Sequence, residues 1–235
     1  METHKNLTYS HQNQTDGILV SFEGIDFCGK SIQIEQLISK LKANNISHVL
    51  LREPGGTIIA EKIRETLLNK ALENMNPITE YLLYSAARAQ LVEQKIFPAL
   101  HNGTVVICDR FYDSSTAYQG YGRGIDLEII RQINNFATKG LKPHLTFLID
   151  IDLDEMERRK KLVQRELDRM ENQERSFFEK VRQGFLQIAE QESERFHVID
   201  GKTTIEKIAS EIWQNFKKIS RNQDRHNFIY CKRNT

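Results

Sequence analysis

The chain has 235 residues, of which 28% are charged, and its formal net charge is only +1. This length accommodates one large or two small domains, and the balanced charge excludes a broad surface for nucleic acid or an acidic tail. No run approaches 18 apolar residues, the first 16 residues lack the apolar core of a signal peptide, and the three cysteines form no Cys-x-x-Cys pair. We therefore expect a soluble, cytoplasmic enzyme that has neither nucleic acid nor a membrane as a partner.

The first motif follows a polar N-terminal tail, residues 1–16, which we expect to be mobile. Residues 18–22 are an apolar run suited to a buried strand, and residues 32–41 have helical spacing. The segment between them fits the pattern G-x-x-x-x-G-K-[ST], whose backbone N–H groups and helix dipole point at a phosphate. The sequence predicts a nucleoside triphosphate site made of Gly24, Ile25, Asp26, Phe27, Cys28, Gly29, Lys30, Ser31 and Ile32, with Lys30 on the terminal phosphates and the Ser31 hydroxyl on Mg²⁺.

A second strand and two helices are expected next. Residues 48–52 are predicted to be a strand, residues 53–57 break it, and residues 58–68 return to helical spacing. Asn76-Pro77 is a helix start, with Asn76 as the cap. This helix carries Tyr81, Tyr84, Arg88 and Leu91 on one face, and Pro98 is expected to end or kink it.

The remaining chain continues to alternate strands and helices. We expect strands at 105–109, 145–149 and 196–199, a helix at 126–139 closed by Gly140, and capping boxes at Asp152/Glu155 and Thr203/Glu206 that open two further helices. A highly charged segment, residues 155–175, precedes an amphipathic helix that ends near residue 191, and residues 220–235 read as a polar, mobile tail. This order predicts an α/β fold, a three-layer doubly wound parallel sheet of about five strands.

The charged residues at the predicted strand ends indicate phosphoryl transfer. Asp109 ends a strand, where phosphate-loop enzymes commonly hold the acid that steadies the Mg²⁺ shell. Lys30, Arg52 and Arg110 would surround a charged transition state at the carboxyl edge of the sheet. A GTPase would need an Asn-Lys-x-Asp tetrapeptide, which the chain lacks, and a motor ATPase or helicase would usually be longer and more basic. A small kinase with a second pocket for the phosphate acceptor remains.

Several further motifs make this interpretation specific. In order, they are Phe22-Glu23-Gly24-Ile25-Asp26 before Gly29-Lys30-Ser31, Arg52-Glu53-Pro54-Gly55-Gly56-Thr57, Ala86-Ala87-Arg88-Ala89-Gln90, Asp109-Arg110-Phe111, Ala117-Tyr118-Gln119-Gly120 and Glu166-Leu167-Asp168-Arg169-Met170-Glu171. With these motifs the chain resembles the thymidylate kinase family of phosphate-loop nucleoside monophosphate kinases over about residues 17–218. The resemblance implies ATP- and Mg²⁺-dependent conversion of dTMP to dTDP for dTTP synthesis, a catalytic domain at 17–219, a helical lid at about 155–170 and a homodimer.

The resemblance also implies roles for individual residues. Tyr84 matches the ring that stacks on thymine, Arg88 the residue that hydrogen-bonds the base, and Tyr118 the ring that crowds the sugar 2′ position. Residues matched to the rest of the acceptor are Arg52 and Arg110 at its phosphate, Asp26 near the 3′-hydroxyl, and Ser115 and Gln119 along the nucleotide. Ser31 and Asp109 are the expected Mg²⁺ ligands.

The chain departs from the family pattern at two places. Phe27 stands where the family usually has Gly, or Arg in members whose catalytic arginine lies in the loop. The catalytic arginine is then expected from the lid, where Arg158 matches the family's helix arginine, and Arg165 substitutes for a second arginine that Leu162 replaces. These departures keep open the alternative of a nucleotide-binding protein without turnover. A broader pyrimidine deoxynucleotide or deoxynucleoside kinase is a second alternative.

Overall fold

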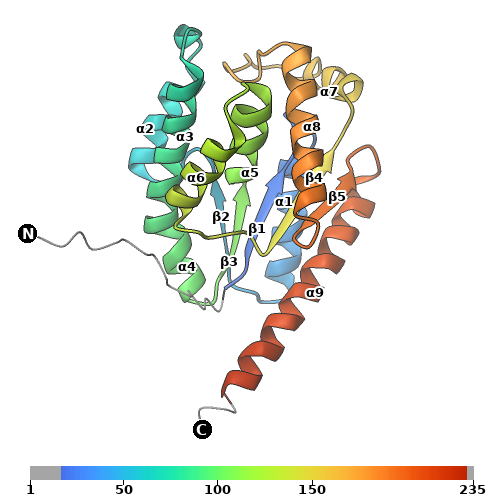
Figure 1. Ribbon diagram of the computed structural model, residues 1–235. Helices are drawn as coiled ribbons and strands as arrows, with labels where there is room; N and C mark the ends of the chain where they lie inside the picture. Colours follow the sequence, from blue (N-terminus) through green and yellow to red (C-terminus); the bar gives the residue numbers. More distant parts are fainter. Residues whose placement is uncertain (1–16, 232–235) are drawn as a thin grey trace, which may run out of the picture.

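A sheet of five parallel strands forms the centre of the computed structural model (Figure 1), which describes residues 17–231 and their side chains from 17 to 221. The strands are β1 (Leu19–Glu23), β2 (His48–Arg52), β3 (Val105–Asp109), β4 (Leu145–Asp150) and β5 (Phe196–Asp200), in the order β2-β3-β1-β4-β5. This confirms the expected doubly wound parallel sheet. The predicted N-terminal tail, residues 1–16, lies outside the described residues.

Helices connect the strands and cover both faces of the sheet (Figure 1). They are α1 (Lys30–Ala43), α2 (Ile58–Leu68), α3 (Pro77–Leu91), α4 (Phe97–His101), α5 (Tyr112–Ser115), α6 (Leu127–Thr138), α7 (Leu153–Lys160), α8 (Arg175–Gln191) and α9 (Ile205–Cys231), with π-helical turns η2 (Val92–Ile96) and η3 (Thr116–Gly122) and a 3₁₀ turn η1 (Lys70–Leu72). Within the part of the chain that the structure describes, every helix is too short or too polar to cross a bilayer.

Alternating side chains of the central strand divide the core in two. Val20 and Phe22 pack into a large apolar cluster with α1, α8 and α9, whereas Leu19 packs into a smaller cluster with α3, η2 and α4. Successive residues of a strand point to opposite faces, so one fully buried strand anchors both layers of helices. The carboxyl end of β1 is held in place from both sides, which fixes the loop that follows it.

Helix capping follows the sequence with one correction. The side chains of Asn76 and Asp152 accept hydrogen bonds from the backbone N–H groups of Ile78 and Glu155, each at 2.9 Å, as expected. The prediction of Thr203 as a cap was wrong by one residue. Thr204 Oγ1 accepts from Lys207 N at 3.3 Å, and the Thr203 hydroxyl instead donates to the Asp200 carbonyl.

Three boundaries differ from the sequence-based expectations. Helix α3 passes through the π-turn η2 into α4, whose first turn contains Pro98. Helix α9 continues through Cys231, so residues 220–231 are helical rather than an irregular tail. In the predicted lid, only the part up to Lys160 is helical, and turns and irregular chain connect it to α8.

Candidate active site

The phosphate loop joins β1 to α1 with three residues in the left-handed region. Gly24, Phe27 and Gly29 have φ values of 137°, 64° and 100°. Lys30 is buried, and its Nζ donates to the carbonyl oxygens of Gly24 and Ile25 at 3.2 Å each. The loop therefore surrounds a lysine ammonium at the N-terminus of a 14-residue helix, an arrangement suited to binding phosphate.

Phe27 occupies a position whose backbone conformation favours glycine. A bulky residue in the left-handed region is strained by roughly 1–2 kcal/mol. Its half-buried ring packs against the main apolar cluster, which offsets part of that cost. Phe27 therefore adds an apolar contact between the loop and the core, and its side chain carries no charge that could bind a phosphate.

Asp26 forms the centre of a cluster beside this loop. Arg110 Nη2 donates to Asp26 Oδ1 at 2.6 Å, and the Tyr118 hydroxyl donates to Asp26 Oδ2 at 2.9 Å. Burial acts to raise the pKa of Asp26, but Arg110 and Lys30 outweigh it and hold this pKa below its ordinary value. Asp26 therefore stays ionised and fixes one edge of the Arg110 guanidinium.

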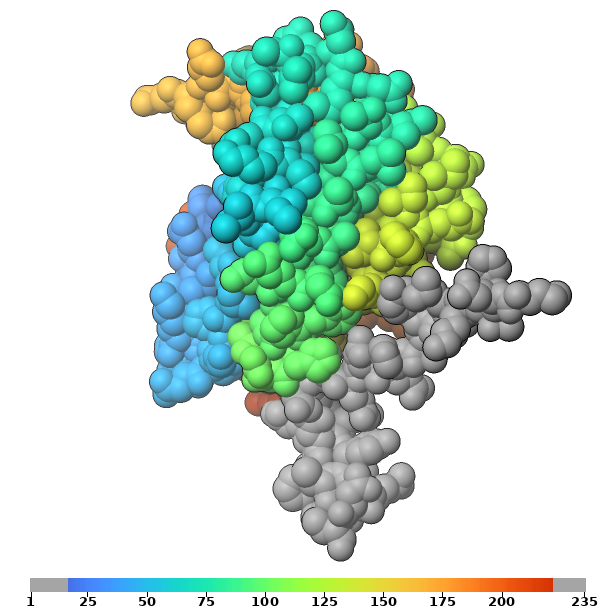
Figure 2. Space-filling view, turned by 90° about the vertical axis from the view of Figure 1, so that its left-hand side faces the viewer, coloured from blue at the N-terminus to red at the C-terminus, as the bar shows by residue number. Residues whose placement is uncertain are grey.

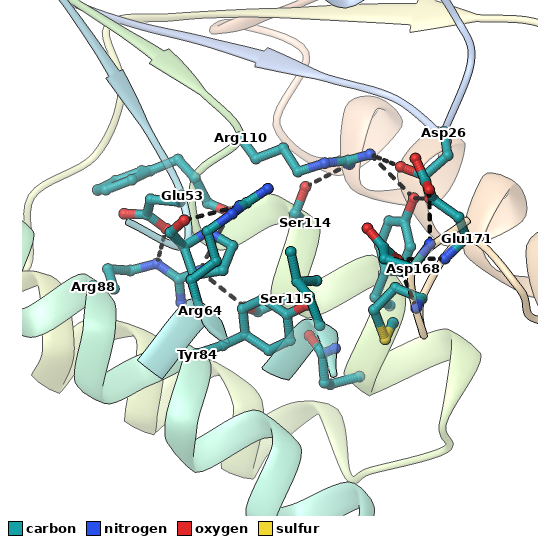
Figure 3. A pocket seen from close by; sticks show the side chains of 16 residues that line it. Asp26, Glu53, Arg64, Tyr84, Arg88, Arg110, Ser114, Ser115, Asp168 and Glu171 are labelled. Carbon is teal, nitrogen blue, oxygen red and sulfur yellow. Dashed lines mark hydrogen bonds and ion pairs between the residues drawn. The ribbon is translucent and has the colours of Figure 1, made fainter. Parts of the chain in front are cut away.

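A cavity of about 160 Å³ opens beside Arg110 (Figure 3). Arg110 lies between two groups of side chains, with Glu53, Arg64, Tyr84 and Arg88 on one side and Asp26, Asp168 and Glu171 on the other. Of the eight predicted acceptor residues, seven line the cavity: Asp26, Tyr84, Arg88, Arg110, Ser115, Tyr118 and Gln119. Residues 112–122, which form α5 and η3, and residues of α3 thus meet at the carboxyl edge of the sheet.

Arg88 is fixed almost completely by buried partners. Its side chain is 2% exposed, and its Nε donates to Glu53 Oε2 at 2.7 Å. Its Nη1 and Nη2 donate to Asn134 Oδ1 at 3.2 Å and to Ser115 Oγ at 2.9 Å. Burial raises the pKa of Glu53, and the charge of Arg88 acts against this rise. The guanidinium is held in one orientation at the end of the cavity where Tyr84 lies.

The structure places Arg52 outside this cavity and Arg64 inside it. Arg52 forms a half-exposed pair with Glu61, in which both carboxylate oxygens accept from Nη2 at 2.9 and 3.0 Å. Arg64 lines the cavity and donates to the Pro54 carbonyl at 2.9 Å. Arg64 is not among the acceptor residues expected from the sequence, although its spacing of four from buried Ala60 and three from buried Leu67 places it on the inward face of α2.

Of the arginines in the predicted lid, Arg159 contacts the phosphate loop. Its Nη1 donates to the carbonyl oxygen of Cys28 at 2.9 Å, and its Nη2 donates to the Gly201 carbonyl at 2.8 Å. Arg158 instead pairs with Glu155 and is 63% exposed. Met156 is buried, and Arg159 lies three residues beyond it on the same helix face, so helical spacing favours Arg159 over Arg158 as the inward-facing arginine.

The other predicted lid residue, Arg165, makes a bidentate pair with Glu171. Its Nη1 donates to Glu171 Oε2 at 2.7 Å and its Nη2 to Glu171 Oε1 at 2.5 Å. Glu171 lines the cavity beside Arg110 together with Asp168 and Met170, so the end of the predicted lid contributes to the wall of this cavity. Arg165 itself lines neither this cavity nor the second one, which is described next.

A second cavity, of about 280 Å³, lies on the other side of the phosphate loop. It is lined by Phe27, Cys28, Gly29, Ile32, Gln33, Arg159, Gly201, Thr203, Ile205 and Ile208. Its mixed apolar and polar lining, with one arginine along it, suits a planar heterocycle whose phosphates continue into the loop.

The predicted Mg²⁺ ligands lie at the same edge of the sheet. Ser31 is exposed in the first turn of α1, and Asp109 ends β3, directly opposite Phe22 of β1 in the parallel register. The described residues contain no group of three or more His, Cys, Asp or Glu side chains that could hold a metal ion. Two oxygen donors fit Mg²⁺, which is commonly held by one or two protein ligands together with substrate phosphates and water.

Comparisons with known proteins identify the family of this chain. A family model described as Thymidylate kinase matches residues 22–212. The chain is 49% identical to the thymidylate kinase of Caldanaerobacter subterraneus subsp. tengcongensis over 186 residues, which cover 79% of this chain and 88% of the relative. It is 43% identical to the thymidylate kinase of Kosmotoga olearia over 201 residues, 85% of this chain and 95% of the relative.

A solved structure agrees with the sequence comparisons. The crystal structure of thymidylate kinase from Ehrlichia chaffeensis is 33% identical, with a TM-score of 0.68, and the match covers 86% of this chain and 98% of that chain. The family match, the shared fold and the motifs around the phosphate loop agree, and the chain belongs to the thymidylate kinase family.

Proposed function

We propose that this protein is a cytoplasmic kinase that transfers the γ-phosphoryl group of ATP to dTMP, giving dTDP and ADP. The observation that carries the proposal is the pair of cavities on the two sides of one phosphate loop. Asp26 lines the first, and Phe27, Cys28 and Gly29 line the second. A donor bound in the second cavity and an acceptor bound in the first would meet at Lys30.

The first cavity is proposed as the dTMP site. The ring of Tyr84 would stack on thymine, and the Arg88 guanidinium, already fixed by Glu53, would hydrogen-bond the base. Tyr118 is tied to Asp26 through its hydroxyl, so its rigid ring would crowd the position of a ribose 2′-hydroxyl. Ser115 and Gln119 would complete the wall along the nucleotide.

Arginines would neutralise the acceptor phosphate. Arg110 projects between the two halves of the cavity, and Arg64 lines the same space. Arg52 would have to release Glu61 to join them. Each cation lowers the repulsion between two anionic reactants, and an arginine at the transferring group is typically worth about 10³–10⁵ in rate.

The second cavity is proposed as the ATP site. Backbone N–H groups of the phosphate loop and Lys30 would hold the phosphates, and Arg159 would lie along the base. Ser31 and Asp109 would hold Mg²⁺, which would supply positive charge to the phosphates. The dTMP phosphate oxygen is already anionic, so the protein needs no general base, and its task is to align the two nucleotides.

We also propose that two copies of this chain associate through α2, α3 and α6, which lie side by side on the face shown in Figure 2. These helices expose large apolar side chains. Ile58 is 84% exposed, Phe136 78% and Ile78 60%. Removing such side chains from water is the usual driving force for association. Sedimentation should give a dimer mass, and Phe136→Asp should shift it toward the monomer, whereas a wild-type monomer at micromolar concentration contradicts this proposal.

The activity is tested by transfer of radiolabelled γ-phosphate from Mg-ATP to dTMP. We expect labelled dTDP, with loss of more than about 10³-fold in kcat/KM for Lys30→Ala and Arg110→Ala. Lys62→Ala, which removes one side of an exposed ion pair on α2, serves as the control and should retain wild-type turnover. Wild-type turnover in the Lys30 or Arg110 variant would refute the assigned roles.

A further inference from the structure

Arg110 has a backbone conformation that its own sequence does not favour. Its φ is 70°, in the left-handed region, although it is neither Gly, Asn nor Asp. Such a conformation persists only where neighbouring groups fix it, and these positions cluster at functional sites. Arg110 lies between the end of β3 and the start of α5, so contacts to this short turn must hold it.

The side chain that fixes this turn is Glu23, the last residue of β1. It is fully buried, and its Oε1 accepts from the backbone N–H of Phe111 at 2.7 Å. Its Oε2 accepts from the Ser114 hydroxyl at 2.6 Å. One carboxylate therefore spans the turn directly after Arg110 and the first turn of α5.

Ser114 connects this carboxylate to the Arg110 guanidinium. The Ser114 Oγ accepts from Arg110 Nη1 at 3.1 Å, and the same nitrogen donates to the Gly24 carbonyl at 2.8 Å. Glu23 thus acts on Arg110 twice, through the peptide at Phe111 and through the hydroxyl of Ser114. Glu23 itself lines neither the first cavity, proposed for dTMP, nor the second, proposed for ATP.

Keeping a carboxyl group at this position is costly. Burial and the neighbouring charge of Asp113 raise the pKa of Glu23, and Asp113 is itself held by Arg195, whose Nη1 and Nη2 donate to its two oxygens at 2.8 Å each. An apolar residue would avoid this desolvation but could not supply two acceptors in line with Phe111 and Ser114.

We propose that Glu23 is a positioning residue for Arg110, which it fixes through the turn at Phe111 and through the Ser114 hydroxyl. The inference rests on the proposed role of Arg110 at the acceptor phosphate. Displacement of a positioned group by about 1 Å can cost about 100-fold in rate. Loss of Glu23 should therefore affect the acceptor half of the reaction and leave ATP binding almost unchanged.

The test is a double-mutant cycle of Glu23→Ala with Arg110→Ala, read as kcat and as separate KM values for dTMP and ATP. We expect Glu23→Ala to lower kcat/KM for dTMP by about 100-fold, with the KM for ATP within about twofold of wild type. In the Arg110→Ala background the same change should have almost no further effect, because residues that act through one another are non-additive. An equal loss in both backgrounds, or wild-type kcat/KM in Glu23→Ala, would overturn the inference.

Two further variants separate positioning from a purely structural role. Glu23→Gln should recover most of the activity, since its amide oxygen can accept from Phe111 N–H while its amino group donates to Ser114 Oγ. Ile212→Ala, a buried position of α9, should lower the melting temperature but leave kcat/KM of the folded protein unchanged. If Glu23→Gln is as impaired as Glu23→Ala, the two contacts do not carry the effect and the proposal fails.

Ser114→Ala keeps the proposal testable if Glu23→Ala does not fold. It should lower kcat/KM for dTMP in the wild-type background and have no effect in the Arg110→Ala background, and an equal loss in both refutes the link. Wild-type turnover with dTMP tests the proposed activity separately. If a different acceptor is phosphorylated, the same cycle is measured with that acceptor, so an error in the substrate does not conceal an error about Glu23.

Discussion

The buried pair of Arg88 and Glu53 provides a test that does not depend on turnover. Their side chains are 2% and 4% exposed, and Arg88 Nε donates to Glu53 Oε2 at 2.7 Å. Arg88→Ala leaves Glu53 buried without a cation. Removing one partner of a buried pair typically costs about 3–5 kcal/mol of stability, much of it the penalty of the remaining unpaired charge.

The cost of Arg88→Ala should depend on pH in a defined direction. Burial already raises the folded-state pKa of Glu53, and loss of Arg88 raises it further, because the attraction that opposes burial disappears. A raised carboxyl pKa means that the folded state binds more protons than the unfolded state, so stability falls as pH rises through this interval. The relevant pH interval lies between the folded-state pKa of Glu53 in the wild type and its higher pKa in the variant. Within this interval, the loss of unfolding free energy caused by Arg88→Ala shrinks by up to about 1.4 kcal/mol for each unit by which the pH is lowered.

Urea unfolding followed by circular dichroism at several pH values between 5 and 8 measures this difference. The cost of Arg88→Ala should be largest at pH 8 and smaller at pH 5. Lys62→Ala, which breaks a pair whose side chains are 73% and 66% exposed, should give no resolvable change at any of these pH values. A cost for Arg88→Ala that is the same at pH 5 and pH 8 would show that Glu53 is not left as an unpaired charge.

Three further predictions concern single positions around the two cavities. Arg159→Ala should raise the KM for ATP by about 10-fold or more, and by more than Arg158→Ala does, because only Arg159 contacts the phosphate loop; equal effects in steady-state assays would contradict this. Arg64→Ala should raise the KM for dTMP more than Arg52→Ala does, since Arg52 is paired with Glu61; the reverse order would restore Arg52 as the main phosphate contact. Phe27→Gly should be more stable than Phe27→Ala by about 1 kcal/mol in urea unfolding, because glycine relieves the left-handed strain, and an alanine variant of equal or greater stability would exclude such strain.

Local patterns were sufficient for much of this fold. The strand–loop–helix order of residues 18–41, the other strands and the caps at Asn76 and Asp152 depend on residues close together in sequence, and the structure confirms them. The boundary errors have local physical causes. Before Pro98, the backbone of η2 changes from the α-helical to the π-helical hydrogen-bond pattern. At the start of α9, the sequence offers both Thr203 and Thr204 as caps, and Thr204 is the one that accepts the hydrogen bond.

The long arginine side chains could not be placed from sequence with the same success. Arg64 lines the cavity, whereas Arg52 pairs with Glu61 outside it, and the sequence does not distinguish these two positions. Neighbours Arg158 and Arg159 differ in helix face, so a spacing argument from buried Met156 would have favoured Arg159. The contacts of Glu23 join residues about 90 positions apart, and no local pattern reveals them.

The central claim is that this protein phosphorylates dTMP. Steady-state ADP release from Mg-ATP across a panel of dTMP, dUMP, thymidine, AMP, CMP and GMP tests it most directly. We expect dTMP to have the highest kcat/KM, because hydrogen bonds to Glu53 and Asp26 fix Arg88 and Tyr118, which we propose to contact the base and the sugar. Comparable turnover with dUMP or thymidine would indicate a broader pyrimidine kinase, and ATP binding without turnover of any acceptor in the folded protein would contradict the proposed activity.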